Sequence, residues 1–355
     1  MFETVATYRR QAESVEADLM TRTTDLATLI DPPFSLAKRR RIRGLLDATE
    51  GPRGQLYRIW AAQMMTAEAR ALPFGHPDRR YFLAVDGRLR LWTQTQALLD
   101  RVLKARPLPL LPDEPPATSP EYAQLLAYQR CFDRLHGYFS PTPPDLYAAV
   151  TGRHGDLPYP FTGFLRLMQM IRRLALAMGR TGQVSFLDMG CGVGLKLVQA
   201  AEFFDVVHGV EYDAERAEVA DTLIQRSRRA QDRATQGDAL TFDDYGQYDV
   251  IYAYKPLSDP ELLQAMERRM IAQARPDTIL ILPYFEIDFR FDDLGLTRLS
   301  DKVFLTGGAG RDLTQVLQKA GHIGTILPQA VIGLPGAEGF TEPLRQMLRH
   351  WGHLA

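Results

Sequence analysis

The stretch that decides the fold is Phe186-Leu187-Asp188-Met189-Gly190-Cys191-Gly192-Val193-Gly194-Leu195. It continues a mainly apolar run that starts at residue 184, which is typical of a buried strand in a parallel sheet. Glycine then occupies every second position, and residues 195–202 indicate a helix. A strand, a glycine turn and a helix in this order let the backbone approach a nucleotide-like ligand, because glycine has no Cβ to hold the ligand away.

The spacing of the glycines distinguishes two classes of ligand. A dinucleotide fingerprint, G-x-G-x-x-G, would need its third glycine at residue 195, which is leucine. The third glycine is Gly194 instead, so the pattern that starts at Asp188 is D-x-G-x-G-x-G. This pattern resembles motif I of the class I S-adenosylmethionine-dependent methyltransferases.

Later segments follow in the order that this family shows. A second apolar strand reaches Glu211, 17 residues after Gly194, which is about where an acidic side chain meets ribose hydroxyls in such folds. The second strand covers residues 205–213, and a helix is predicted after it over residues 214–229. The third, fourth and fifth strands are predicted over residues 234–239, 247–257 and 279–283.

The resemblance implies how the methyl donor, S-adenosylmethionine, would be held. Asp188 and the glycine backbone would hold its methionine end, and Glu211 would accept hydrogen bonds from its ribose. Asp238 would meet the adenine amino group, and Ala239 would offer a backbone donor to the ring. For each acid, a surface carboxylate or a helix cap is the simpler alternative. The predicted cofactor-binding residues are Asp188, Gly190, Cys191, Gly192, Gly194, Glu211, Tyr212, Asp238 and Ala239.

Composition restricts the class of protein. The 355 residues are 45% apolar and 24% charged, as in a soluble globular protein. The net charge of −1 provides no global field for nucleic acid or an anionic membrane. Only two cysteines occur, and no apolar stretch reaches 18 residues, so we expect a cytoplasmic protein without disulfides.

Two proline-rich breaks, residues 107–120 and 141–144, separate a helical region from the sheet-forming one. The prediction is an α-helical N-terminal region, residues 1–144, that acts as a lid, a specificity element or a partner-binding region. Residues 145–355 would form an α/β methyltransferase domain with a seven-stranded Rossmann-like sheet. Its last strand is expected to be antiparallel, as the resemblance implies.

Apolar periodicity places the remaining elements. In residues 81–103 a helix competes with a hairpin that would turn at Asp86-Gly87. One later helix is expected to point Leu125, Leu126, Cys131, Phe132 and Leu135 inward. The other predicted segments are helices over residues 4–29, 53–72, 121–138, 161–178 and 313–320, and chain completing the sheet at 302–305 and 325–327.

The chemistry needs little from the protein beyond positioning, because the methyl group moves by in-line displacement. Positioning can lower such a barrier by roughly 7–11 kcal/mol. The candidate catalytic residues are Tyr254 and Lys255, at the tip of the fourth strand, and Glu286, after the fifth. A packing tyrosine and a solvated lysine are the alternatives.

Strand alternation would place Tyr252 beside Tyr254, and Ala253 beside Lys255 on the other face. Family members that methylate amines often carry a polar residue, prolines and an aromatic residue at this tip. The tip here has one proline and no aromatic residue after it, which leaves an amine acceptor in doubt. The aromatic side chains of Tyr159 and Phe161 could close the pocket, or simply pack in the core.

Other patterns favour ordinary structure. The basic run of residues 38–43 is more typical of a solvated helix face than of a nucleic-acid site. His350 and His353 have no cysteine or acid nearby, so no metal is expected.

Three function classes remain. The first is a methyltransferase acting on the nitrogen or oxygen of a small molecule, with a protein side chain as the alternative acceptor. The second is a non-catalytic binding or scaffold protein, and the third is a nicotinamide-dependent oxidoreductase, which Leu195 disfavours. The oligomeric state is left open.

Overall fold

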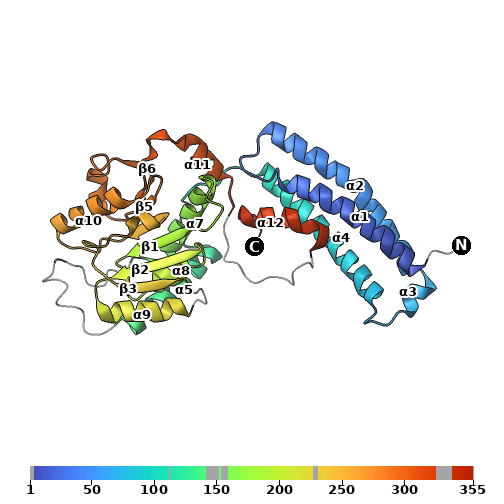
Figure 1. The fold of residues 1–355 in the computed structure, drawn as a ribbon, viewed down its shortest axis with the longest axis horizontal. Coiled ribbons are helices and arrows are strands. Elements are labelled where there is room, and N and C mark those ends of the chain that lie inside the picture. The colour runs from blue at the N-terminus through green and yellow to red at the C-terminus, as the bar shows by residue number, and fades with distance from the viewer. Residues whose placement is uncertain are drawn as a thin grey trace. The chain divides into compact units, whose positions relative to one another are not determined.

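The computed structural model describes residues 4–111, 113–140, 152, 159–226, 231–324 and 338–354. The chain forms two compact units (Figure 1). The helical unit is Met1–Leu108 with His322–Ala355, and the α/β unit is Pro109–Gly321. The α/β unit begins at residue 109, whereas the sequence predicted a functional boundary at residue 144. That functional boundary stays a prediction. The predicted break at residues 141–144, the helix end at 227–229 and the segment 325–327 lie outside the described residues.

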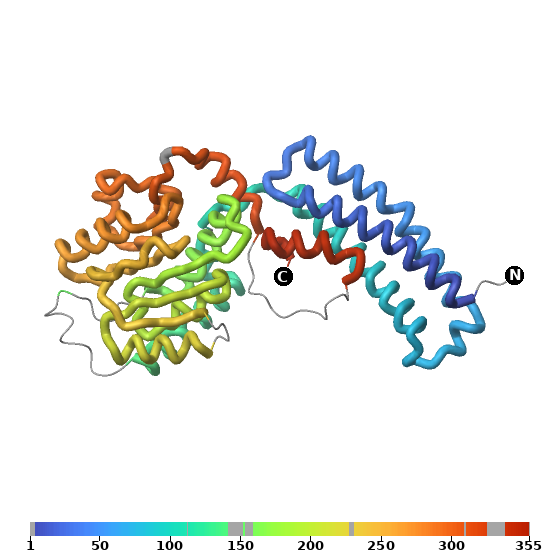
Figure 2. Tube along the Cα trace, viewed as in Figure 1, coloured from blue at the N-terminus to red at the C-terminus, as the bar shows by residue number. Residues whose placement is uncertain are grey.

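The helical unit is built from long amphipathic helices. Figure 2 shows α1 and α2 running side by side, and their residues are in contact. The helix predicted over residues 81–103 is confirmed, because α4 continues through Asp86 and Gly87 without a turn. Trp92 of α4 packs against Phe340, with ring centroids 6.0 Å apart, so C-terminal residues complete this core. The helices are α1 (Val5–Ala27), α2 (Leu36–Met64), α3 (Ala67–Ala71), α4 (Pro77–Lys104), the 3-10 helix η4 (Gly339–Thr341) and α12 (Glu342–His350).

The α/β unit contains the predicted seven-stranded sheet, in the order β3-β2-β1-β4-β5-β7-β6. Strands β1 to β5 are parallel, and β7 is antiparallel to both of its neighbours. Strand β6 was not predicted, because its sequence LTRLS lacks the continuous apolar run of the central strands. The strands are β1 (Ser185–Met189), β2 (Val206–Glu211), β3 (Arg233–Gln236), β4 (Val250–Ala253), β5 (Ile279–Ile281), β6 (Leu296–Ser300) and β7 (Val303–Thr306).

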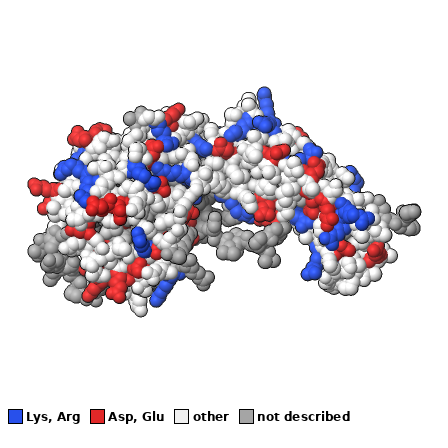
Figure 3. Space-filling model, viewed as in Figure 1, with Lys and Arg blue, Asp and Glu red and all other residues white. Residues whose placement is uncertain are grey.

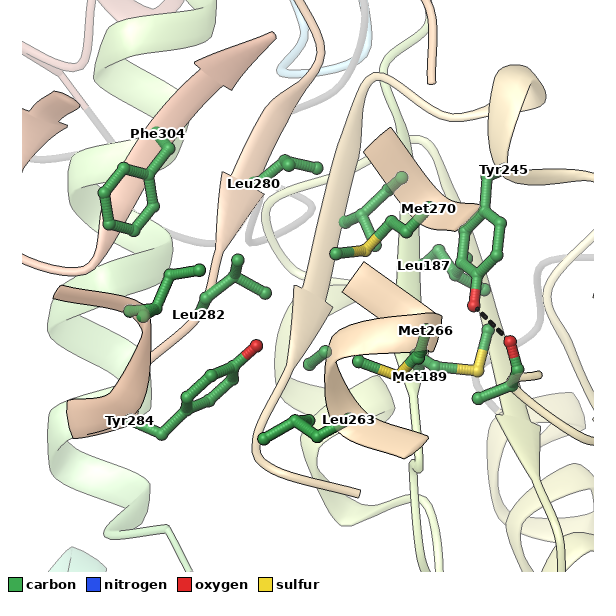
Figure 4. Close-up of a cluster of buried hydrophobic side chains, with 14 of the residues drawn as sticks. Leu187, Met189, Tyr245, Leu263, Met266, Met270, Leu280, Leu282, Tyr284 and Phe304 are labelled. Carbon is green, nitrogen blue, oxygen red and sulfur yellow. Dashed lines mark hydrogen bonds between the residues drawn. The ribbon is translucent and has the colours of Figure 1, made fainter. Parts of the chain in front are cut away.

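Alternation along β1 sends its side chains to opposite faces of the sheet. Leu187 and Met189 pack in one apolar cluster with Met266 of α10 (Figure 4). Phe186 points to the other face, where its ring lies 6.4 Å from that of Phe164 in α7. Asp188 therefore faces α7. The helices of this unit are α5 (Pro120–Phe139), α7 (Phe161–Ala177), α8 (Leu195–Ala200), α9 (Ala214–Gln225), α10 (Pro260–Gln273) and α11 (Leu313–Gly321).

Helix α5 was predicted to within one residue at each end, and its inward face was predicted only in part. Leu126, Cys131 and Leu135 are exposed. The partly buried side of α5 carries the other two predicted residues, Leu125 and Phe132, and the ring centroid of Phe132 lies 4.9 Å from that of Phe161. Successive side chains of a helix point about 100° apart, so a shift of one residue changes which face is inward. The aromatic contact with α7 determines which face of α5 is covered.

None of the helices in the described ranges is long and apolar enough to cross a membrane.

Candidate functional site

A pocket opens at the carboxyl ends of the central strands β1, β2 and β4. Ligands bind at this edge in open parallel sheets. Most of the predicted site residues line this pocket, whereas Gly194 and Glu286 do not. The predicted residues that line it are Asp188, Gly190, Cys191, Gly192, Glu211, Tyr212, Asp238, Ala239, Tyr254 and Lys255.

The glycine turn between β1 and α8 needs glycine for its backbone shape. Gly190 and Gly192 have φ angles of +85° and +56°, in the left-handed region that side chains disfavour. A Cβ on Gly190 would also lie 2.9 Å from the Cβ of Pro256. The Gly190 N–H donates to the carbonyl of Val210, with N and O 2.8 Å apart, which fixes the turn against β2.

Gly194 has a packing role in the structure. Its φ is +80°, and a Cβ there would lie 2.8 Å from the Cα and Cβ of Ala220 in α9. The absence of a side chain thus allows α8 to approach α9. Direct donor binding by Gly194 stays a prediction.

Asp188 is the most unusual residue of the pocket. Its side chain is almost completely buried, with 1% exposed. Neither carboxylate oxygen has a hydrogen-bond partner among the described residues. Burial raises the pKa of Asp188 to about 7, while the positive charge of Lys196 opposes this shift and the charge of Glu211 adds to it. A ligand that donates hydrogen bonds, above all a cation, would satisfy this carboxylate.

Glu211, at the end of β2, holds the glycine turn from the side. One carboxylate oxygen accepts from the Gly192 N–H at 2.9 Å, and the other accepts from the Asp213 N–H at 3.0 Å. Burial raises the pKa of Glu211, and these two backbone donors lower it. Each oxygen still has a second lone pair, so the carboxylate can also accept from hydroxyls of a ligand.

The segment after β3 forms another wall. Asp238 caps its own turn, since Oδ1 accepts from the Leu240 N–H at 3.0 Å. The buried Ala239 is held through its carbonyl, which accepts from the Tyr245 hydroxyl at 3.0 Å (Figure 4). Tyr212, on the β2 side, is exposed. A capping role was the simpler alternative for Asp238, and the structure shows this cap. Asp238 also lines the pocket.

The tip of β4 brings aromatic and charged groups together. The ring of Tyr159 lies 5.0 Å from that of Tyr254 and 6.3 Å from that of Tyr252. Lys255 has a φ of +45°, and its ammonium forms an ion pair with Glu286. This pairing lowers the pKa of Glu286, so the carboxylate stays charged. Glu286 therefore reaches the pocket only through Lys255.

Sequence reasoning missed two lining residues of chemical interest. Tyr252 was noted only for its face on the strand, yet it is the register partner of Asp188 on the neighbouring strand. Lys196 follows the glycine turn, and its ammonium lies 5.3 Å from the centre of the Phe161 ring. The pairing register is a property of two distant segments, so no local signal marked Tyr252.

Charged side chains outside the pocket are distributed differently. Figure 3 shows acidic and basic side chains interspersed over the face in view. The basic run lies at the start of α2, where the residues around the buried Ile42 are exposed or half-buried. Within the described part of the chain, no cluster of His, Cys, Asp or Glu is arranged to hold a metal ion.

Comparison with known proteins gives a match to one family model over part of the chain. Residues 187–277 match the family model described as a methyltransferase domain. This match covers the glycine turn, Glu211, Asp238 and the β4 tip. No curated protein sequence matches the chain.

Several solved structures are similar to part of the chain. One is YcgJ protein from Bacillus subtilis, at 22% identity over 32% of this chain and 50% of that chain, with a TM-score of 0.25. Another is S-adenosylmethionine-bound CalS10, an amino pentose methyltransferase from Micromonospora echinaspora, at 24% identity over 41% and 58%, with a TM-score of 0.29. A third is magnesium protoporphyrin IX methyltransferase (ChlM) from Synechocystis PCC 6803 with the donor bound, at 21% identity over 49% and 94%, with a TM-score of 0.32. The chain thus spans only 50% and 58% of the first two structures.

Proposed function

We propose that the α/β unit is a class I S-adenosylmethionine-dependent methyltransferase domain and that it methylates a nitrogen or oxygen atom of a small molecule. The observation that carries the proposal is the pocket at the edge of the sheet, where the buried carboxylate of Asp188 lies beside the left-handed glycine turn. Tyr254 and Lys255 line the same pocket, so donor and acceptor groups would share one space.

The residues present fit the donor. Asp188 lacks a hydrogen-bond partner among the described residues, and the ammonium of the donor's amino-acid end would supply one. The turn at Gly190 and Gly192 presents bare backbone beside it. Glu211 retains lone pairs for the ribose hydroxyls, and Asp238 lies on the wall assigned to adenine.

Transfer itself requires orientation more than acid–base chemistry. When bound, the donor supplies an electrophilic methyl group. The protein holds the acceptor atom in line with that group, and such positioning can contribute roughly 7–11 kcal/mol. Tyr254, at the β4 tip, is the side chain best placed to orient an acceptor, because its ring is braced by Tyr159. We assign Lys255 and Glu286 to the support of this tip, since they neutralise each other as an ion pair.

Two alternatives differ in the partner. A protein side chain could be the acceptor, or the domain could bind a partner without catalysis. The small molecule is favoured because the pocket is lined by aromatic and charged groups from one unit. In the same proposal, the helical residues 1–144 shape acceptor choice, and the two unpaired cysteines favour a cytoplasmic location.

Calorimetric titration with S-adenosylmethionine and S-adenosylhomocysteine is the first test. Binding with micromolar affinity is expected, together with a clear loss of affinity in Glu211→Ala. A screen of small amines, alcohols and phenols with labelled donor then tests the acceptor class. Donor binding without transfer to any small molecule, but with labelling of a protein in an extract, would favour the protein acceptor. Absence of donor binding would refute the proposal.

A further inference from the structure

A second buried polar group lies beside Asp188. Tyr252 of β4 is its register partner across the β1–β4 pair, and both side chains line the pocket. Each residue is only 1% exposed. The Tyr252 hydroxyl, like the Asp188 carboxylate, has no hydrogen-bond partner among the described residues.

Packing explains the ring of Tyr252 but not its hydroxyl. The ring lies edge-on to Phe164 of α7, with centroids 5.1 Å apart, and to Tyr159 at 6.3 Å. A phenylalanine would make these contacts equally well and would leave no buried polar atom unpaired, which is costly. A buried hydroxyl that has no partner among the described residues therefore indicates a ligand group that bonds to it.

The two side chains differ in what they can bind. A carboxylate only accepts hydrogen bonds and repels an anion, whereas a tyrosine hydroxyl can donate one. The two residues are register partners on strands about 4.8 Å apart, and both line the same pocket, so one ligand can meet both groups. An α-amino acid carries an ammonium and a carboxylate on one carbon and matches this pair. Lys196, whose charge acts on Asp188, adds a positive charge at the same end of the pocket.

We propose that the Tyr252 hydroxyl donates a hydrogen bond to the α-carboxylate of the methyl donor, while Asp188 accepts from its α-ammonium. This inference rests on the proposed function and assigns Tyr252 as a residue that reads the donor's amino-acid end. It separates the roles of the two strands: β1 recognises the cation and β4 recognises the anion.

Three ligands distinguish the two roles. S-adenosylhomocysteine carries both charged groups, decarboxylated S-adenosylmethionine keeps only the ammonium, and 5′-methylthioadenosine has neither. Affinities are measured by calorimetry for the wild type, Tyr252→Phe and Asp188→Asn, and each ligand is compared only with itself across variants. Tyr252→Phe should weaken S-adenosylhomocysteine about tenfold or more, as for a hydrogen bond to a charged group. It should leave the other two ligands within about twofold.

Asp188→Asn should weaken both ligands that carry the ammonium and spare 5′-methylthioadenosine. The matched control is Tyr248→Phe, which also removes one buried hydroxyl, here bonded to Nδ1 of His208 at 2.8 Å and outside the pocket lining. It should leave all three affinities unchanged, and thermal unfolding checks the fold of every variant.

The possible failures are distinct. Equal weakening of all three ligands by Tyr252→Phe, or no weakening of any, would overturn the assignment of the hydroxyl. Weakening of decarboxylated S-adenosylmethionine as much as S-adenosylhomocysteine would also overturn it, because the carboxylate would then not be the group that is read. A wild type that binds none of the ligands would instead refute the proposed function.

Discussion

Asp188 should make donor binding depend on pH in a defined direction. Burial raises its pKa in the empty pocket to about 7, so near neutrality part of the protein carries the neutral acid. The donor's ammonium needs the ionised carboxylate and would lower this pKa in the complex. Binding therefore releases a proton below pH 7, and the affinity rises with pH until the carboxylate is fully ionised.

The size of the effect follows from the pKa. With a value of about 7, the apparent dissociation constant increases by a factor of roughly 11 at pH 6 and only about 1.3 at pH 7.5. S-adenosylhomocysteine should thus bind about eightfold more weakly at pH 6 than at pH 7.5, or about 1.2 kcal/mol. This window also lies below the range where an α-amino group loses its own proton.

The assay is calorimetric titration at four pH values in buffers of different ionisation enthalpy, which reports the protons released. Asp188→Asn should abolish the pH dependence and bind weakly throughout, with the smallest difference from wild type at pH 6. Two other charged groups act on Asp188, namely Lys196 and Glu211. Glu211→Gln therefore serves as the control, and it should keep the slope that Asp188 produces.

An affinity that does not change between pH 6 and pH 7.5 in the wild type would refute the reasoning. So would a slope that persists in Asp188→Asn, because another group would then carry the titration.

Three further outcomes are expected. Gly192→Val should abolish donor binding and lower stability by about 1–2 kcal/mol, because Gly192 has a left-handed φ. Gly194→Val carries the same backbone strain and would also collide with α9, so it should lower stability by about 1–3 kcal/mol more. An equal loss of stability in the two variants would contradict this division. Lys255→Gln should change stability by less than about 1 kcal/mol, because the ion pair of Lys255 with Glu286 is partly exposed. The same variant should leave the affinity for S-adenosylhomocysteine unchanged in calorimetry, and a tenfold loss of affinity would place Lys255 at the donor. Without ligand, Asp188→Asn should become more stable relative to wild type in thermal melts as the pH rises from 5 to 7.5. The reason is that folding raises the pKa of this carboxyl from 3.8 to about 7, and between these two values the ionised carboxylate destabilises the fold by about 1.4 kcal/mol for each pH unit. A constant difference in stability across this range would refute the assigned shift.

Much of the α/β unit could be predicted because its signals are local. Buried parallel strands are short apolar runs, and the glycine turn at Gly190 and Gly192 is visible as a motif. Strand β6 escaped prediction for the opposite reason: an edge strand with polar residues such as Arg298 carries no such run. The covered face of α5 was predicted only in part, since it depends on aromatic contacts with Phe161 rather than on the spacing of aliphatic residues.

The features that could not be predicted are non-local. Phe340 and the helix after it complete a core with Trp92, although nearly 250 residues separate them. Glu211 was expected to meet a ribose, and nothing in the sequence indicated that it also holds the glycine turn through Gly192. Tyr252 became a candidate only when the strand register placed it beside Asp188.

The success with local signals and the failure with non-local features share one physical cause. A binding site keeps polar groups that the protein itself does not satisfy, and such groups are recognisable only when all their neighbours are known. Asp188 illustrates this, because its motif gives its position on the strand, whereas only the folded unit shows that its oxygens have no partner among the residues described. The same isolation that raises its pKa and weakens the empty fold leaves its full hydrogen-bonding capacity for a cation. Donor binding should therefore stabilise this protein more than the contact with Asp188 alone would suggest, since it also removes the cost of an unpaired buried carboxylate.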